Sequence, residues 1–227
     1  MIKQGKSLVP VLIFALCEVM IVLGGQLNDT VVPTDFTVSF YNARQERMTS
    51  DGLFNERQTG TIWQDLTPGD EKLAMKVATR RFGQQNIIKN EFIVTRKVNG
   101  QFVKYQYVKD FETTPAFPNG REYCNKFPVP KFKDFFYELR NNMTQKDPNN
   151  KDLYHYDNGP MDFSRDYINK YWYFGPRHVT QPYVPAMIRT KTLRGTRFSI
   201  DNTKNVGFYY RFKPSPAVFN IPYKCLQ

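Results

Sequence analysis

Histidine and cysteine are scarce in this chain of 227 residues, which contains two of the first and three of the second. His155 and His178 are too few for a histidine-rich metal site, so we expect no metal and no cofactor. The sequence also has no Gly-x-Ser-x-Gly elbow, no glycine-rich phosphate loop and no His-Glu-x-x-His motif. These absences predict a protein that is not an enzyme. A hydrolase that assembles carboxylates from distant positions stays open as an alternative.

Long apolar runs are also lacking, except at the N-terminus. There, an apolar stretch from Leu8 to Leu23 follows two lysines and precedes the small residues Gly24 and Gly25, which is the layout of a secretory signal peptide. The stretch is shorter than the about 20 apolar residues that span a bilayer, and it contains Glu18. We therefore predict residues 1–25 to be a signal peptide and the protein to be secreted or lysosomal. An uncleaved membrane anchor and a buried core helix are the alternatives.

Acidic residues are outnumbered by basic ones, 21 to 32, and the formal net charge is +11. The lysines and arginines are scattered along the chain, so ordinary solubility explains the charge. The alternative is attraction to acidic glycans, matrix or anionic lipid headgroups. In a secreted protein we expect no nucleic-acid partner.

Cys124 and Cys225 would remain after loss of a signal peptide that contains Cys17. In an oxidising compartment two cysteines most simply form one disulfide, and two buried free thiols are the alternative. Two sequons predict N-glycosylation at Asn28 and Asn142, which begin Asn-Asp-Thr and Asn-Met-Thr.

Apolar residues alternate with polar ones along most of the remaining chain, which predicts strands. Such runs begin at Phe36, Gly60 and Tyr171. Leu73–Val77 also alternates, but its residues are good helix formers, and we expect a strand there because the neighbouring segments are strands. Two further alternating runs flank Asn99-Gly100, which predicts a hairpin because Asn-Gly favours the type I′ turn.

Polar stretches predict turns and loops in the second half of the chain. We expect a second hairpin with its turn at Asp201–Asn205, after which Val206, Phe208, Tyr210 and Phe212 would share one face. Residues 141–160 are rich in Asn, Asp, Lys and Pro and predict a long exposed loop. A short helix is expected within residues 133–141.

The predicted fold is mainly β, with two curved antiparallel sheets around an aromatic-rich core or pocket and one or two short helices. We assign residues 26–227 to a single domain. Aromatic residues make up 15% of the chain. They either fill the space between the sheets or line a cavity for an apolar ligand.

The candidate walls of such a ligand pocket are aromatic residues on the predicted strands. They are Trp63, Tyr105, Tyr107, Trp172, Phe174, Phe208 and Tyr210. Arg189 or Lys191 at the mouth would meet an anionic headgroup.

Three segments of the chain resemble ependymin-related proteins. Lys213–Cys225 (KPSPAVFNIPYKC) resembles the end of these proteins. Lys104–Lys109 (KYQYVK), followed by Tyr123–Pro128 (YCNKFP), is similar to a strand and a Cys-x-Lys-x-Pro turn of the family. Gly60–Asp65 (GTIWQD) resembles a strand near its start.

The resemblance implies a secreted or lysosomal ependymin-like glycoprotein with a two-sheet fold similar to bacterial lipoprotein carriers. It also implies a deep hydrophobic pocket, homodimer formation through sheet edges, and association with extracellular matrix, calcium and lipid-like ligands. The chain has fewer cysteines than the family usually carries, so the resemblance extends to the pair Cys124 and Cys225 alone.

The leading functional hypothesis is a secreted, non-enzymatic glycoprotein that binds a hydrophobic small molecule or lipid between antiparallel sheets. The alternative is a structural or interaction subunit that an uncleaved N-terminal helix holds in a membrane assembly.

Overall fold

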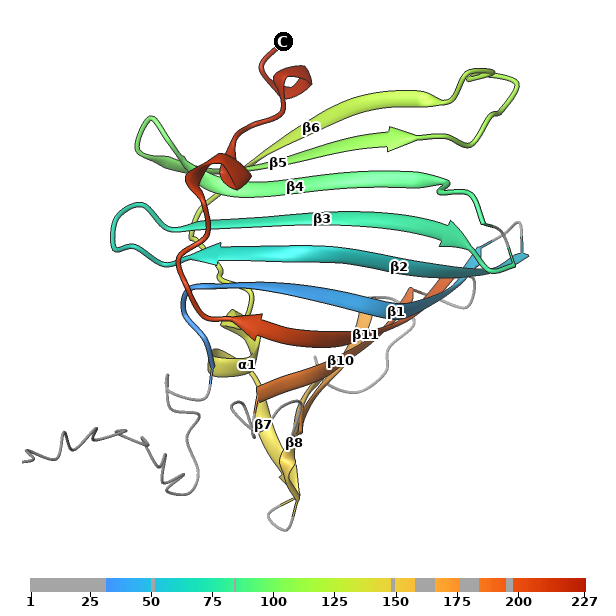
Figure 1. Ribbon diagram of the computed structural model, residues 1–227. Helices are drawn as coiled ribbons and strands as arrows, with labels where there is room; N and C mark the ends of the chain where they lie inside the picture. The colour runs from blue at the N-terminus through green and yellow to red at the C-terminus, as the bar shows by residue number, and fades with distance from the viewer. Residues whose placement is uncertain are drawn as a thin grey trace, which may run out of the picture.

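The computed structural model describes residues 32–49, 52–83, 85–147, 150–157, 166–175, 184–194 and 198–227 (Figure 1). The N-terminal segment and Asn28 lie outside the described residues. Eleven strands dominate the part that is described. They are β1 (Phe36–Thr49), β2 (Gly52–Asp65), β3 (Lys72–Arg81), β4 (Lys89–Val98), β5 (Gln101–Asp110), β6 (Arg121–Val129), β7 (Thr144–Asp147), β8 (Asn150–Asp157), β9 (Asp166–Gly175), β10 (Val184–Arg194) and β11 (Phe198–Tyr210). The helices are short: α1 (Tyr137–Asn141), η1 (Pro216–Phe219) and η2 (Tyr223–Cys225).

The strands are antiparallel and form a sheet in the order β6-β5-β4-β3-β2-β1-β11-β10-β9-β8-β7. The prediction of a mainly β, antiparallel fold with few short helices is confirmed. Two sheets were expected. Hydrogen bonds connect all eleven strands, so the structure has one continuous sheet, which bends. Figure 1 shows β10 to β7 turning away from the layer of β1 to β6. β6 and β7 are the two edges and do not pair with each other.

The predicted Asn99-Gly100 hairpin is confirmed. β4 and β5 pair from Val98 opposite Gln101 onward, and Asn99 and Gly100 have φ of 49° and 82°. Positive φ at both central residues is the requirement of a type I′ turn, whose twist matches that of the flanking strands.

The second predicted hairpin is wrong, because β11 runs unbroken through the residues that were expected to turn. Asn202 and Asn205 of this stretch are paired with neighbours on both sides, in β1 and in β10. The expected common face of Val206 and Tyr210 is also wrong. Val206 lies opposite Phe40 while Tyr209 lies opposite Val38, so an extra residue shifts the alternation.

The long exposed loop predicted for residues 141–160 is also wrong. Most of this stretch forms the hairpin of β7 and β8, which pairs with β9 at the edge of the sheet. Polar composition misled the prediction, because an edge hairpin needs only a few apolar residues, here Tyr154 and Tyr156, to pack against the core. The short helix expected within residues 133–141 is confirmed as α1.

The two faces of the sheet carry separate apolar clusters. We call the inner face of the bend, marked by Met75 and Val77 of β3, the concave face, and the outer face, marked by Ala74, the convex face. We call the buried apolar residues of the concave face cluster one. They come from β1–β3 with the residues just before β1, from β9–β11 and from the α1 region, and these elements meet because the sheet bends. The residues of cluster one are Val32, Phe36, Val38, Phe40, Ile62, Val77, Phe136, Leu139, Met143, Trp172, Phe174, Val184, Val206 and Tyr209.

The segment that leads into α1 fills one end of the concave face with aromatic rings. The ring centroids of Phe135 and Phe136 each lie 5.6 Å from that of Trp172. Gln64, which is 0% exposed, fixes this segment, since its Oε1 accepts a hydrogen bond from Phe135 N at 2.8 Å. Its Nε2 donates to Thr34 O at 2.7 Å. A buried side-chain amide thus has both ends satisfied and holds α1 in place.

The C-terminal segment crosses the convex face from the end of β11 to β6 (Figure 1). Phe219 is buried there against Ala74, Val94, Val103 and Tyr105, which together form cluster two. The predicted disulfide is present: Cys124 of β6 is bonded to Cys225 of η2, at a sequence separation of 101. The segment is therefore fixed at its far end by a covalent bond.

Asp65 fixes the near end of the same segment. It is buried and accepts hydrogen bonds from Thr67 N and Oγ1 at 3.0 and 2.6 Å, while Lys213 Nζ lies 3.6 Å from its Oδ2. Burial alone would raise the pKa of Asp65. The hydrogen bonds from Thr67 and the charges of Lys213 and Lys72 outweigh it, and the pKa lies below its usual value of 3.8.

Within the described residues, no helix is long and apolar enough to cross a membrane.

Candidate functional site: the concave sheet face

Side chains on the concave face change from apolar to polar along the strands. On β2 the sequence of concave positions is Gln64, Ile62, Gly60, Gln58 and Glu56, and their neighbours on β3 run from Leu73 to Arg81. On β11 the same change occurs between Val206 and Asn202. We call the part of the concave face that carries these polar side chains the polar end, and define it by Gln58, Thr79, Glu91, Asn202 and Lys204.

Lys204 is the most unusual group at the polar end. It lies opposite Ile188 of β10, which packs against cluster one, so its side chain shares the concave face. Its Nζ donates a hydrogen bond to Asn202 Oδ1 at 3.0 Å and lies 6.0 Å from the centroid of the Phe40 ring. Burial lowers the pKa of Lys204 from 10.5 to about 8, and the negative charge of Glu91 only partly opposes this effect.

Glu91 influences the charge of Lys204 although the two residues lie on strands that are not neighbours in the sheet. β1, β2 and β3 separate β11, which carries Lys204, from β4, which carries Glu91. Gly60 of β2 leaves room for the Phe40 ring, which lies beside Lys204. A Cβ atom at Gly60 would lie 2.6 Å from Phe40 Cζ and 2.0 Å from Lys76 O, so the Phe40 ring occupies the space that a side chain would fill.

Glu91 already has partners of its own. Its Oε1 accepts a hydrogen bond from Gln106 Nε2 at 3.0 Å, and its Oε2 lies 3.0 Å from Lys89 Nζ. Among the described side chains, none with a carboxylate contacts Lys204. The partly buried ammonium group of Lys204 therefore has no counter-ion at contact distance among the described residues.

Other buried polar groups lie on β2 and β3 at the same end. Thr79 is 1% exposed, and its Oγ1 has no hydrogen-bond partner among the described residues. Gln58, directly opposite Thr79, is also buried. Glu56 is 6% exposed and lies directly opposite Arg81. A buried hydroxyl without a partner costs free energy, and a bound polar group would recover it.

The concave face beyond the α1 region keeps apolar positions that are partly exposed. Met75 of β3 lies opposite Ile93 of β4, which lies opposite Gln106 of β5. All three are partly exposed, and Ile93 belongs to neither cluster. This strip of the concave face therefore offers apolar surface next to the polar end.

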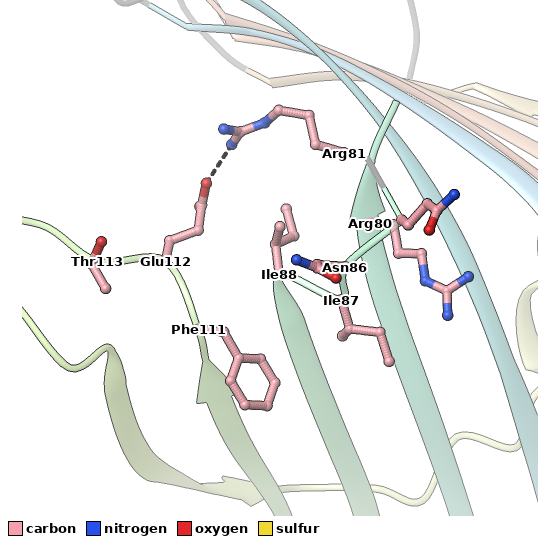
Figure 2. A pocket seen from close by; sticks show the side chains of 9 residues that line it. Arg80, Arg81, Asn86, Ile87, Ile88, Phe111, Glu112 and Thr113 are labelled. Carbon is pink, nitrogen blue, oxygen red and sulfur yellow. Dashed lines mark ion pairs between the residues drawn. The ribbon is translucent and has the colours of Figure 1, made fainter. Parts of the chain in front are cut away.

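A pocket of about 780 Å³ lies at the ends of β3 and β5 (Figure 2). Arg81 Nη2 lies 2.7 Å from Glu112 Oε1, so these two charges neutralise each other. Figure 2 shows Arg81 extending towards Glu112 while Arg80 and Phe111 point away from this ion pair. The polar groups do not converge on one point, and the pocket offers a ligand less specific contact than the polar end does. Its lining comprises Arg80, Arg81, Gln85, Asn86, Ile87, Ile88, Phe111, Glu112 and Thr113.

The structure does not bring the predicted pocket walls together. Trp172 and Phe174 belong to cluster one on the concave face, whereas Trp63 and Tyr105 belong to cluster two on the convex face. Tyr210 is exposed. These residues lie on both faces, and they do not surround one cavity.

The remaining predicted positions lie away from the polar end or outside the described residues. Tyr107 Oη donates to Glu122 Oε1 at 2.9 Å, and burial together with this carboxylate raises the pKa of the tyrosine. The side chain of Phe208 is outside the described residues. Arg189 and Lys191 are exposed and alternate with the concave residues of β10, so they face away from the polar end. Asn142 is exposed at the end of α1, which suits its predicted glycosylation.

Sequence reasoning missed Lys204 and Asn202, because their stretch was taken for a turn. The signal that identifies them is alternation continuing through it, from Asn202 and Lys204 to Val206. Among the described residues, no group of three or more His, Cys, Asp or Glu side chains is placed to hold a metal ion.

Comparison with known proteins gives no family model that matches the chain and no curated protein that matches it in sequence.

Proposed function

We propose that this chain is a secreted, non-enzymatic glycoprotein that holds a hydrophobic, lipid-like ligand on its concave face. The observation that carries the proposal is the strip of Met75 and Ile93, which stays apolar and partly exposed on the inner face of a bent sheet. A curved sheet brings several such strands around one ligand, and lipid sites in proteins are concave and mostly apolar. The resemblance to ependymin-related proteins supports the same class of ligand.

The signal-peptide layout, the disulfide and the exposed Asn142 support secretion of this protein as a glycoprotein. The rings around Trp172 have a different role. They pack against the α1 region and stabilise one end of the sheet, so the ligand contacts the part of the concave face that α1 leaves uncovered.

The first test is to express the full chain through a eukaryotic secretory pathway, extract the purified protein with organic solvent, and analyse the extract by mass spectrometry. The delipidated protein is then titrated with hexadecanol, an uncharged single-chain lipid. We expect a stoichiometric lipid in the extract and saturable binding of hexadecanol.

Matched variants locate the binding on the concave face. Ile93→Glu places a charge in the apolar strip and is expected to weaken hexadecanol binding roughly tenfold or more, because the carboxylate loses water beside an apolar chain. Thr61→Glu adds the same charge at a partly exposed position of β2 that faces the convex side. It should leave binding unchanged. A lipid-free protein that does not bind hexadecanol, or equal losses in both variants, would contradict the proposal.

A further inference from the structure

We propose that the polar end of the concave face binds the anionic head group of an amphipathic ligand, and that the Lys204 ammonium group supplies the counter-charge. This inference rests on the proposed function, because the inference assigns the class and the orientation of the ligand that the proposed function places on the concave face. An amphipathic anion, such as a fatty acid, matches a surface that changes from apolar to cationic along its strands.

The first observation behind the inference is a partly buried cation that has no ion pair among the described residues. Lys204 contacts an amide oxygen, that of Asn202, and an aromatic ring, that of Phe40. Neither contact neutralises its charge. Removing an ammonium group from water without pairing it is costly, and the lowered pKa of Lys204 is the physical expression of that cost. An anion from a ligand would recover part of it.

The other described cations of this face are either paired or lie at the far end of the strands. Lys104 is level with Leu73, and Lys97 lies beyond it, at the opposite end from Thr79. Lys89 pairs with Glu91 on β4, and Lys170 of β9 donates to Glu138 of α1. On β2, Glu56 lies opposite Arg81 rather than beside β11. Among the described cations at the polar end, Lys204 is thus the one without an ion pair, and a ligand's anion would pair with it.

The unpartnered Thr79 hydroxyl is the second, independent observation. Thr79 Oγ1 is buried on the concave face of β3, next to buried Gln58, and has no partner among the described residues. A hydroxyl donates as well as accepts, so it suits an anionic oxygen or the hydroxyl of a polar head group. The lipid chain then extends from this polar end towards Met75 and Ile93.

The test compares two ligands with the same chain and different head groups, palmitate and hexadecanol, on the delipidated full-length protein at pH 7. We expect palmitate to bind roughly 10- to 100-fold more tightly, the range that follows from one hydrogen bond to a charged group. Lys204→Met should remove this preference while hexadecanol binding stays unchanged. Lys76→Met, which removes an exposed lysine on the convex face, should keep the preference.

A pH series provides a second readout that a structural role would not change. The preference for palmitate should fall as the pH rises above about 8, where free Lys204 loses its proton. Hexadecanol binding should not depend on pH in this range.

The outcomes separate the two proposals. If the unmodified protein binds neither ligand, the proposed function fails. If it binds both equally, or if Lys204→Met weakens both equally, ligand binding stands and the anion site at Lys204 is overturned. Loss of the preference in Arg80→Ala instead of Lys204→Met would place the anion in the pocket of Figure 2 and also overturn the inference.

Discussion

Lys204 is a residue whose own folding energetics are unfavourable. Its pKa is about 8 in the folded protein and 10.5 in the unfolded chain. Below pH 8 both states carry the proton, and the folded state bears the full cost of enclosing the charge. Between pH 8 and 10.5 the unfolded state binds more protons, so stability rises with pH.

We therefore predict that Lys204→Met stabilises the protein at pH 7. The expected gain in the free energy of unfolding is at most about 3 kcal/mol, which corresponds to the shift in pKa. The rise in stability between pH 8 and 10 should become smaller in the variant. Urea unfolding at several pH values measures both effects, with Lys76→Met as the control. A variant that is less stable than the unmodified protein at pH 7 would contradict this account.

Gly60 is a second single residue on which the concave face depends. We predict that Gly60→Ala destabilises the protein by about 1–3 kcal/mol, because the new Cβ would overlap the Phe40 ring and the Lys76 carbonyl oxygen. Chemical unfolding followed by circular dichroism measures the loss. Thr61→Ala, at the next position of the same strand, is the control and should change stability little. An unchanged unfolding midpoint in Gly60→Ala would contradict the prediction, because it would show that the Phe40 ring and the backbone move aside with no loss of stability.

Among the elements, the C-terminal segment has the most distinct role, because it covers the convex face and is fixed at both ends. Lys213 contacts Asp65 and Thr67 at its start, and the disulfide fixes its end to β6. Phe219 lies between these anchors in cluster two. The segment thus protects apolar side chains of β3, β4 and β5 from water.

We predict that Cys225→Ser lowers the free energy of unfolding by up to about 5 kcal/mol, the chain-entropy value for a loop of about 100 residues. Cys124→Ser should have the same effect, and the double variant should add little, because all three remove one bond. Unfolding curves with and without a reductant measure this. A reductant that shifts the variants as much as the unmodified protein would contradict the prediction. Hexadecanol binding should survive in folded Cys225→Ser, since the disulfide lies on the opposite face from the ligand.

Across the whole molecule, local rules predicted much of the structure. Asn99-Gly100 predicted a hairpin because its turn chemistry needs no distant partner. The alternation of Leu73, Met75 and Val77 left strand and helix open, and the neighbouring strands decided for a strand. The Cys124–Cys225 bond followed from the number of cysteines. The mainly β fold was predicted from the alternation of apolar and polar residues, and its buried aromatic rings from the aromatic content.

The prediction failed where polar residues occupy strands. Asn202 and Lys204 lie in β11 because they face the polar end of a bent sheet, and a rule that assigns polar stretches to turns misses them. The face of each aromatic residue was also beyond sequence reasoning, since the shift between Val206 and Tyr209 reverses the alternation. The candidate walls were therefore divided between two faces, and Lys204 was not among the candidates.

The position of β11 next to β1 has a consequence for how the chain reaches its fold. β1 to β6 and β7 to β11 are two series in which each strand pairs with its neighbour in sequence, and the β1–β11 pairing alone joins them. Such a high-contact-order step is slow, and it waits until the final strand has left the ribosome. Before it occurs, β1 of one molecule presents an open edge to β11 of another. A high concentration of the protein would then favour exchange of these halves between copies, so dilution during refolding should increase the yield of monomer.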